Sequence, residues 1–278
     1  MGAIRGLGFG REWSVHAACA FQVNMFSLKG KTALVAGASR GIGLAIAQHM
    51  ATAGARTILA ARSVDALTER VRELSSDGFD ATALEMDVSS TASVETAADS
   101  LGEVDILVNV AGTNVRKRFE EYSREEYDRL LETNLHGIVR LTQKLGARMI
   151  TRRKGGKVIN IGSMMSISGL PYLSIYAITK GALGQLTRVL AAEWGRYNIQ
   201  VNCIAPGFIV TDLNRDMWKQ EKMVAWLQAN QANPNLGTPD DVAPLAVFLA
   251  SHGADYITGQ IIAVDGGYST TSVWPFEV

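Results

Sequence analysis

The sequence is poor in cysteine and offers no pattern of metal ligands. Cys19 and Cys203 are its only cysteines among 278 residues, and this distant pair forms neither a disulfide framework nor a zinc-ligand spacing. A reducing compartment fits such usage, and we expect a cytoplasmic protein. His49, His136 and His252 show no metal-ligand spacing either, so no metal is expected.

An excess of either charge and a long hydrophobic run are also missing. Lysine plus arginine number 27, aspartate plus glutamate number 27, and the formal net charge is zero. This balance leaves no electrostatic footprint for nucleic acid or an anionic membrane, and a hydrophobic content of 47% excludes a disordered chain. No uncharged apolar stretch reaches the roughly 18 residues that a membrane-spanning helix needs. We therefore expect neither a nucleic-acid partner nor a membrane partner.

The first 28 residues differ from the remainder of the chain. Arg5 and Arg11 precede a short apolar run that His16 interrupts, which is a poor core for a signal peptide. We expect residues 1–28 to form a poorly ordered extension and residues 29–278 to form a single dinucleotide-binding and catalytic domain.

From Lys31 onward, short apolar or β-branched runs alternate with helical patterns, which is typical of a parallel sheet covered by helices. Helix starts are marked by a capping box at Ser123 and Glu126, and by a cap with a first-turn proline at Thr238–Asp241. The pattern predicts a single doubly wound α/β domain of the Rossmann type, with helices on both faces. Its seven strands are expected at Thr32–Ala36, Thr57–Ala61, Ala81–Met86, Asp105–Asn109, Lys157–Ile161, Gln200–Ile204 and Gln260–Val264.

Three glycines follow the first expected strand and open an apolar helix. Gly37, Gly41 and Gly43 permit a tight turn and a close backbone approach, so a pyrophosphate can sit on free N–H groups at the helix start. Such a triplet also serves ordinary turns. Its place between the first strand and the first helix favours a dinucleotide site.

The end of the second strand indicates which dinucleotide binds. Sites for NAD usually place a carboxylate there, whereas sites for NADP place a cation near the 2′-phosphate. Here Arg62 follows the strand, no carboxylate stands beside it, and Arg40 in the glycine loop could face the same phosphate. We expect NADP(H) to be preferred and NAD(H) to be the alternative; in the competing interpretation both arginines are merely solvated.

Tyr176 and Lys180 are four residues apart, and on a helix they share one face. A nearby cation favours the phenolate form of tyrosine, so we expect the pKa of Tyr176 to be lowered toward the neutral range that acid–base catalysis uses. The same spacing occurs by chance in many helices, where the lysine only covers an aromatic ring.

Together with Ser163, the loop at Gly37–Gly43 and the run Asn109–Gly112, this pair resembles the short-chain dehydrogenase/reductase family. The resemblance covers most of the chain. It implies hydride transfer between a nicotinamide and a ketone or secondary alcohol. The implied catalytic residues are Asn134 as support for a proton relay, Ser163 as the hydroxyl that orients the carbonyl, Tyr176 as the proton donor or acceptor, and Lys180 as its activator and ribose ligand.

The resemblance also implies the cofactor contacts. They lie in the glycine loop, at the ends of the second, third and fourth strands, and in the loop after the sixth strand. The residues are Gly37, Ser39, Arg40, Gly41, Ile42, Gly43, Arg62, Asp87, Val88, Asn109, Ala111, Gly112, Tyr176, Lys180, Pro206, Gly207, Ile209 and Thr211. Ala36 and Val110 depart from the usual threonine and asparagine of the family, and we expect altered stability or affinity there.

The substrate is less constrained by the sequence. Residues 212–236 carry Trp218 and Trp226 and could form a lid over the site or an interface with a neighbouring subunit. The cations Arg116, Lys117 and Arg118 suit an anionic substrate, although such a run is often only a solvated loop. The chain is most similar to the branch of the family that acts on gluconate and related keto sugar acids. Its segment at 233–237 lacks the arginine usual in that branch, which leaves a different ketone open.

Two alternatives to this function remain, namely reduction of 3-oxoacyl groups on a carrier protein and a non-catalytic dinucleotide sensor. The complete catalytic set argues against a sensor. The apolar helices expected at Tyr127–Met149 and Tyr176–Trp194 correspond to the helices that form four-helix interfaces in the family, so we expect a homotetramer.

Overall fold

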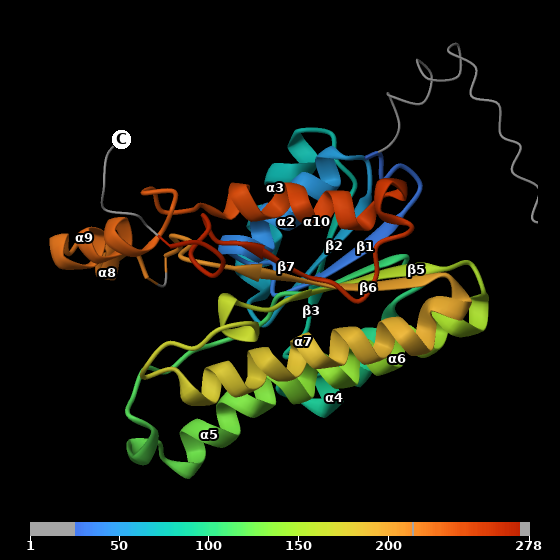
Figure 1. Ribbon diagram of the computed structural model, residues 1–278. Helices are drawn as coiled ribbons and strands as arrows, with labels where there is room; N and C mark the ends of the chain where they lie inside the picture. The colour runs from blue at the N-terminus through green and yellow to red at the C-terminus, as the bar shows by residue number, and fades with distance from the viewer. Residues whose placement is uncertain (1–25, 213, 273–278) are drawn as a thin grey trace, which may run out of the picture.

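The computed structural model describes residues 26–212 and 214–272, in which seven parallel strands form one sheet (Figure 1). The strand order is β3-β2-β1-β4-β5-β6-β7, so the order reverses between β1 and β4. The strands are β1 (Thr32–Ala36), β2 (Arg56–Ala61), β3 (Ala81–Glu85), β4 (Ile106–Asn109), β5 (Gly156–Ile161), β6 (Ile199–Pro206) and β7 (Ile261–Val264). All seven expected strands are found, each within two residues of its expected bounds.

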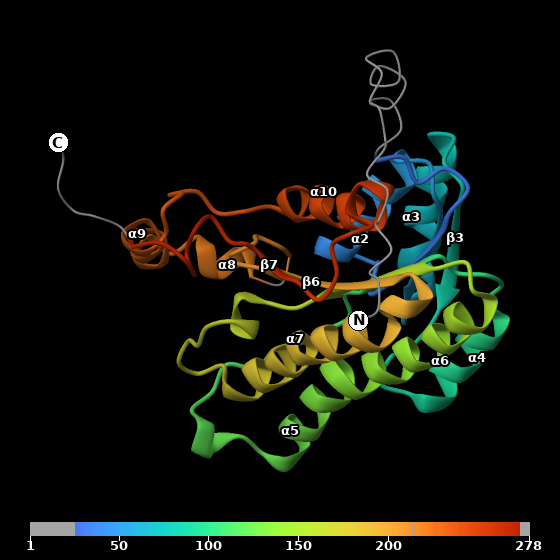
Figure 2. The same ribbon diagram turned by 45° about the vertical axis from the view of Figure 1, so that its right-hand side comes forward.

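Helices cover both faces of this sheet, and Figures 1 and 2 show the three layers. On one face lie α2 (Gly41–Thr52), α3 (Val64–Ser76) and α10 (Pro239–Ala250). On the other face lie α4 (Thr91–Ser100), α6 (Gly137–Arg152) and α7 (Ser174–Trp194), with α5 (Arg124–Leu131) at the end of α6. The short helices α8 (Arg215–Trp218) and α9 (Glu221–Asn230) project beyond the sheet.

Each face of the sheet has its own hydrophobic core. The strands β4 and β6 are buried along their whole length. β4 is apolar except for Asn109, whereas β6 also buries the polar side chains of Gln200 and Asn202. Leu59 and Ile46 pack in the core beneath α2 and α10, whereas Leu107 and Leu141 pack in the core beneath α4 and α6. The expected doubly wound α/β fold is therefore confirmed.

The helix caps form where the sequence places them. Ser123 and Glu126 make the expected capping box at the start of α5, and Thr238 and Asp241 make one at the start of α10. The helix expected at Tyr127–Met149 is interrupted, because a π-helical turn at Glu132–His136 separates α5 from α6.

The chain joins the domain at its first described residues. Leu28 is buried in the core under α2, its N–H donates to the carbonyl of Ala53, and Phe26 packs edge-on against Phe248 of α10. Residues 26–28 of the expected extension therefore pack on the domain, and residues 1–25 lie outside the described part. No helix in the described part is long and apolar enough to cross a membrane.

The close contact between α6 and α7 yields a test of the packing. A Cβ atom at Gly146 of α6 would lie 2.3 Å from the indole Cη2 of Trp194, which is a steric overlap. We expect Gly146→Ala to lower the free energy of unfolding by about 1–3 kcal/mol, the usual cost of overpacking. Urea denaturation measures this.

The same substitution in a Trp194→Phe background serves as the control. Phenylalanine lacks the outer indole atoms, so the alanine should cost at least about 0.5 kcal/mol less there. Strictly additive costs would show that the two side chains do not compete for this space.

Candidate active site

The predicted site residues converge on the carboxyl edge of the sheet. There the strand order reverses, and the loops that follow β1 and β4 lie side by side, since Val110 N and Ala111 N both donate to the carbonyl of Ala36. Parallel sheets hold their ligands at such a reversal. The loops after β5 and β6 reach the same edge, because β5 pairs with both β4 and β6.

The glycine loop is packed too tightly for any other residue at two positions. Gly37 has φ +102°, and a Cβ on it would lie 2.7 Å from Ala111 N. A Cβ on Gly43 would lie 2.1 Å from the carbonyl oxygen of Gly37. The helix α2 begins here without a side-chain cap and without an acidic residue in its first turn. The helix start can therefore receive a phosphate on free N–H groups.

Two unpaired cations flank this helix start. Arg40 precedes α2 and Arg62 follows β2; both are exposed, and within the described residues neither forms an ion pair. Ser39 and Ile42 are half-buried in the same loop. An exposed pair of arginines beside a helix start that could receive a phosphate suits a further phosphate on the ribose.

The third strand brings an acid to the same edge. Asp87 is half-buried, and its Oδ1 accepts hydrogen bonds from Ser89 N (2.9 Å) and from Ser89 Oγ (2.7 Å). Val88 beside it is buried and packs on Gly137. This arrangement fixes the carboxylate and leaves Oδ2 without a described partner, so an exocyclic amine of a base could donate to it.

Asn109 ends β4 at the start of the segment predicted to line the cofactor. Its side chain is fully buried, and its Nδ2 donates to Thr142 Oγ1 (2.9 Å) and to Asn160 Oδ1 (2.8 Å). The side-chain amide therefore ties the end of β4 to α6 and β5, and this segment can offer a cofactor only its main chain. Gly112, three residues later, does lie at the edge, with the Asn134 amide and the Lys180 amine both near its Cα.

The loop after β6 borders the candidate site at the carboxyl edge of the sheet, opposite the β4 loop. Pro206 ends β6, and Gly207 lies against Asp265, where a Cβ would approach to 2.6 Å. Ile209 is buried and bridges to Gly237, while Thr211 lies against Gly41 of the glycine loop. The sixth strand's loop thus meets the first strand's loop across the site.

The phenol of Tyr176 lies beside the hydroxyl of Ser163. Burial raises the pKa of Tyr176 above its ordinary value, and the Ser163 hydroxyl and the Arg116 charge oppose this rise. The sequence predicts a lowered pKa, and that direction is wrong for the protein described here. Desolvation of the phenolate outweighs its favourable neighbours.

The position of Lys180 explains why the pKa of Tyr176 is not lowered. Its side chain is almost fully buried, and its Nζ donates to the carbonyl oxygen of Ile161 at 2.8 Å, lying 5.7 Å from the centre of the Tyr176 ring. Burial lowers the pKa of Lys180 to about 8. The amine is therefore one turn from the phenol, as predicted, but is turned toward the end of β5.

Asn134 sits inside the π-helical turn, which nothing in the sequence signals. Its Nδ2 donates to the carbonyl of Thr113 (2.8 Å) and its Oδ1 accepts from Thr113 N (2.8 Å). Nδ2 also lies 3.3 Å from Thr179 Oγ1 on α7. π-Helical turns are rare and frequent at functional sites, and this one fastens the β4 loop to both neighbouring helices.

The described residues of the segment expected to form a lid or an interface, 212 and 214–236, include α8 and α9, and aromatic rings fasten both helices to the domain. The ring of Phe208 meets Trp218 and Trp226 edge-on at 5.4 Å each and Tyr268 at 5.0 Å. Arg116 reaches across from the β4 loop, with its Nη1 2.8 Å from Met217 Sδ. Both tryptophans therefore contribute to a packed cover beside the site.

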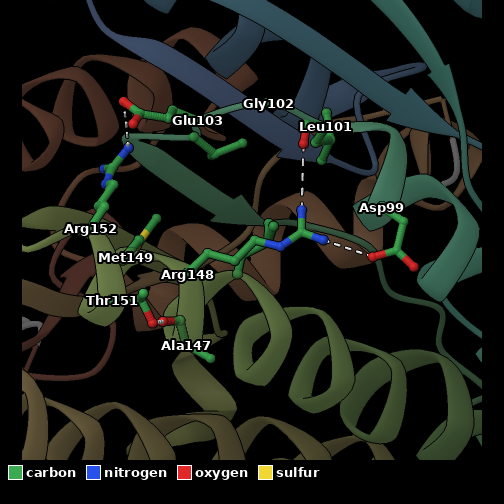
Figure 3. Close-up of a pocket in the computed structure, with 11 residues that line it drawn as sticks. Asp99, Leu101, Gly102, Glu103, Ala147, Arg148, Met149, Thr151 and Arg152 are labelled. Atoms are coloured by element: carbon green, nitrogen blue, oxygen red, sulfur yellow. Dashed lines mark hydrogen bonds and ion pairs between the residues drawn. The ribbon is translucent and has the colours of Figure 1, made fainter.

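A hollow of about 490 Å³ lies elsewhere, between the end of α4 and the end of α6 (Figure 3). It is at the amino edge of the sheet, and its arginines are matched by acids: Arg148 with Asp99, and Arg152 with Glu103 and Asp105. None of the predicted site residues lines it. Among the described residues no group of three His, Cys, Asp or Glu side chains could hold a metal ion.

Comparison with known proteins agrees with this geometry. The family model described as Enoyl-(Acyl carrier protein) reductase matches residues 37–269. Gluconate 5-dehydrogenase of Gluconobacter oxydans is 34% identical over 252 residues, covering 89% of this chain and 98% of the relative. A tropinone reductase homologue of Arabidopsis thaliana is 37% identical over 250 residues, covering 88% and 94%. The crystal structure of a gluconate 5-dehydrogenase from Burkholderia cenocepacia in complex with NADP and tartrate has a TM-score of 0.86 at 35% identity, covering 90% and 99%.

The parallel sheet, its glycine loop and the adjoining serine, tyrosine and lysine define a nicotinamide-dependent oxidoreductase. The chain belongs to the short-chain dehydrogenase/reductase family, as the sequence predicts, and acts on CH–OH groups.

The buried amine gives a prediction for stability. The folded pKa of Lys180 is about 8 against 10.5 for the free side chain, so above pH 8 the unfolded chain holds a proton that the folded chain has lost. Stability should therefore rise with pH between 8 and 10.5, an effect that Lys180→Met abolishes. In urea denaturation at pH 7 and pH 9, the native protein should gain about 1 kcal/mol relative to the variant. Parallel pH dependences for the two proteins would contradict the assignment of a depressed pKa.

Proposed function

We propose that this protein is an NADP(H)-dependent oxidoreductase that interconverts a ketone and a secondary alcohol, with Tyr176 as its acid–base group. The observation that carries the proposal is the meeting of the Ser163 hydroxyl, the Tyr176 phenol and the Lys180 amine at the β4 loop, which packs on the glycine loop. When bound, the nicotinamide supplies or accepts a hydride at the carbon of the substrate. The chain must then supply or remove only one proton at the substrate oxygen.

The roles of the side chains follow from their chemistry. In reduction, the Tyr176 phenol donates its proton to the oxygen of the carbonyl that is being reduced, and the Ser163 hydroxyl holds that oxygen in place. In oxidation the phenolate takes the proton back. Lys180 would hold the ribose hydroxyls, and its charge would then stabilise the phenolate. Asn134, bonded to Thr113, supports the path by which the proton returns to solvent.

Preference for NADP(H) is supported by Arg40 and Arg62. Both are exposed near the helix start that would carry the pyrophosphate. An ion pair at 4 Å contributes about 1–4 kcal/mol, depending on the effective dielectric constant. The NADP in the Burkholderia cenocepacia structure supports the same cofactor for this chain.

An anionic sugar acid or a related polyol is the substrate class that the site supports best. Arg116 is exposed, contacts Met217 of the segment over the site, and is near enough to Tyr176 to lower the pKa of its phenol. A cation there would attract a carboxylate and repel the ammonium group of an alkaloid ketone. The gluconate dehydrogenase relatives act on substrates of this anionic class.

The proposed assembly is a cytoplasmic homotetramer. Ile178 and Val189 are large apolar residues on α7 that are 50% and 43% exposed, and their spacing of three helical turns places them on one face. Exposed apolar residues on the outside of a long helix suit a helix–helix interface between subunits.

A panel of carbonyl and alcohol substrates with both nicotinamides tests this function. We expect turnover of keto sugar acids and polyols with NADPH or NADP⁺, followed by absorbance of the reduced cofactor. A more than tenfold preference for NADH would overturn the cofactor assignment. Turnover of acetoacetyl thioesters alone would point to carrier-protein substrates, and cofactor binding without any turnover would point to a sensor. In the same assays Tyr176→Phe should abolish turnover and keep cofactor affinity, because it removes only the phenolic hydroxyl that donates and accepts the proton. A rate above a tenth of normal would refute the role of Tyr176.

Substitution of Arg116 tests the substrate class. Arg116→Ala should raise KM for an anionic substrate about tenfold, because loss of a charged hydrogen bond costs about 1.5 kcal/mol or more. The variant should also need a higher pH to reach its full oxidation rate. Oxidation requires the phenolate of Tyr176, and the substitution removes a cation that lowers the pKa of this phenol.

Arg118→Ala is the matched control, because Arg118 is exposed on the same loop two residues away. Equal effects of the two substitutions, or an unchanged KM in Arg116→Ala, would show that Arg116 does not contact the substrate.

A further inference from the structure

A serine outside the catalytic set connects the two halves of the site. Ser166 closes the one-turn 3-10 helix Met164–Ser166 that follows β5. Its Oγ donates a 2.8 Å hydrogen bond to the backbone carbonyl of Lys180 and accepts a hydrogen bond from Ser163 N at 3.3 Å. One hydroxyl therefore bonds to the main chain of two residues that lie in different elements.

The turn itself is closed by reciprocal bonds. Ser163 Oγ accepts from Met165 N at 3.2 Å, and the carbonyl of Ser163 accepts from Ser166 N at 2.7 Å. These contacts leave the Ser163 hydroxyl hydrogen free to point toward the Tyr176 phenol. They fix Ser163 within the turn, but they do not fix the turn against α7.

The space around Ser166 is narrow on the side of β5, where Gly162 must lack a side chain, and Gly184 of α7 lies at ordinary contact distance on the other side. A Cβ on Gly162 would lie 2.7 Å from Ser166 Oγ, and a Cβ on Gly184 would lie 3.6 Å from Ser166 Cβ. Ser166 thus sits in a gap between β5 and α7 that holds a small side chain. A small polar residue is required there, because the hydroxyl must reach the carbonyl of Lys180.

We propose that Ser166 is a positioning residue that sets the distance between the Ser163 hydroxyl and the Tyr176–Lys180 face of α7. The inference rests on the proposed function, in which these three side chains act together. Lys180 is then held at both ends, by Ser166 at its carbonyl and by Ile161 at its amine. Small displacements of reacting groups cost large factors in rate, so the loss of one such bond reaches the chemistry.

Ser166→Ala tests the proposal, because it removes the hydroxyl and leaves the small side chain that the gap requires. We expect kcat to fall about tenfold with KM for NADPH within about twofold of normal. The pH at which the oxidation rate increases should also be higher in the variant. The displaced Ser163 hydroxyl lowers the pKa of Tyr176 less effectively.

Ser168→Ala is the matched control. Ser168 Oγ donates to the carbonyl of Met164 at 3.0 Å, so it too bonds a hydroxyl to the backbone near this turn, but not to α7. We expect kcat and the pH profile to stay normal in this variant. An equal decrease of kcat in both variants would mean that any lost hydrogen bond in this turn disturbs the site. The positioning role of Ser166 would then be wrong.

Two further outcomes distinguish failure of the positioning role of Ser166 from failure of the proposed function. If Ser166→Ala keeps more than half of normal kcat and an unchanged pH profile while Tyr176→Phe is inactive, Ser166 has no positioning role and the proposed function stands. If Tyr176→Phe is active, the proposed function itself fails. Should Ser166→Ala not fold, Ser166→Cys keeps the size with a weaker donor and is judged by the same criteria.

Discussion

The buried amine of Lys180 is the constraint on which the rest of the site depends. An ammonium group is costly to bury, and this one has a single described hydrogen-bond acceptor, the carbonyl of Ile161. It stays in place because β5, α7 and the β4 loop pack around it, with Gly112 leaving room beside it. The same packing fixes Tyr176 one turn away and sets its exposure to water. Stability and acid–base chemistry are therefore coupled through one side chain.

A second buried polar group holds the sheet and helices in register beneath the site. Asn109 on β4 donates to Thr142 on α6 and to Asn160 on β5, and Asn160 donates in turn to Thr187 on α7 at 2.9 Å. Buried amides usually form hydrogen bonds, and here both N–H groups of Asn109 are used, whereas its Oδ1 has no partner among the described residues. These hydrogen bonds connect β4 and β5 to α6 and α7. Asn109 thereby fixes the end of β4, from which the loop beside Ala36 begins.

The substrate side is built from a different kind of contact. Around Phe208 the rings of Trp218, Trp226 and Tyr268 pack edge to face, and these contacts fasten α8 and α9 to the body of the domain. Arg116 is the charged side chain that the β4 loop extends toward this cover. The cofactor side therefore uses backbone N–H groups and glycines, and the substrate side uses aromatic packing and a charge.

The sequence alone determined the elements and their order, because apolar periodicity, capping residues such as Ser123 and the glycine loop are local signals. It also determined which edge carries the chemistry and that Tyr176 and Lys180 share a face. The tertiary structure decided the π-helical turn at Asn134, the inward orientation of Asn109 and the raised pKa of Tyr176. Each of these depends on desolvation or on bonds between residues distant in the chain. Their strengths are set by what surrounds a group in space, which no local pattern of residues specifies.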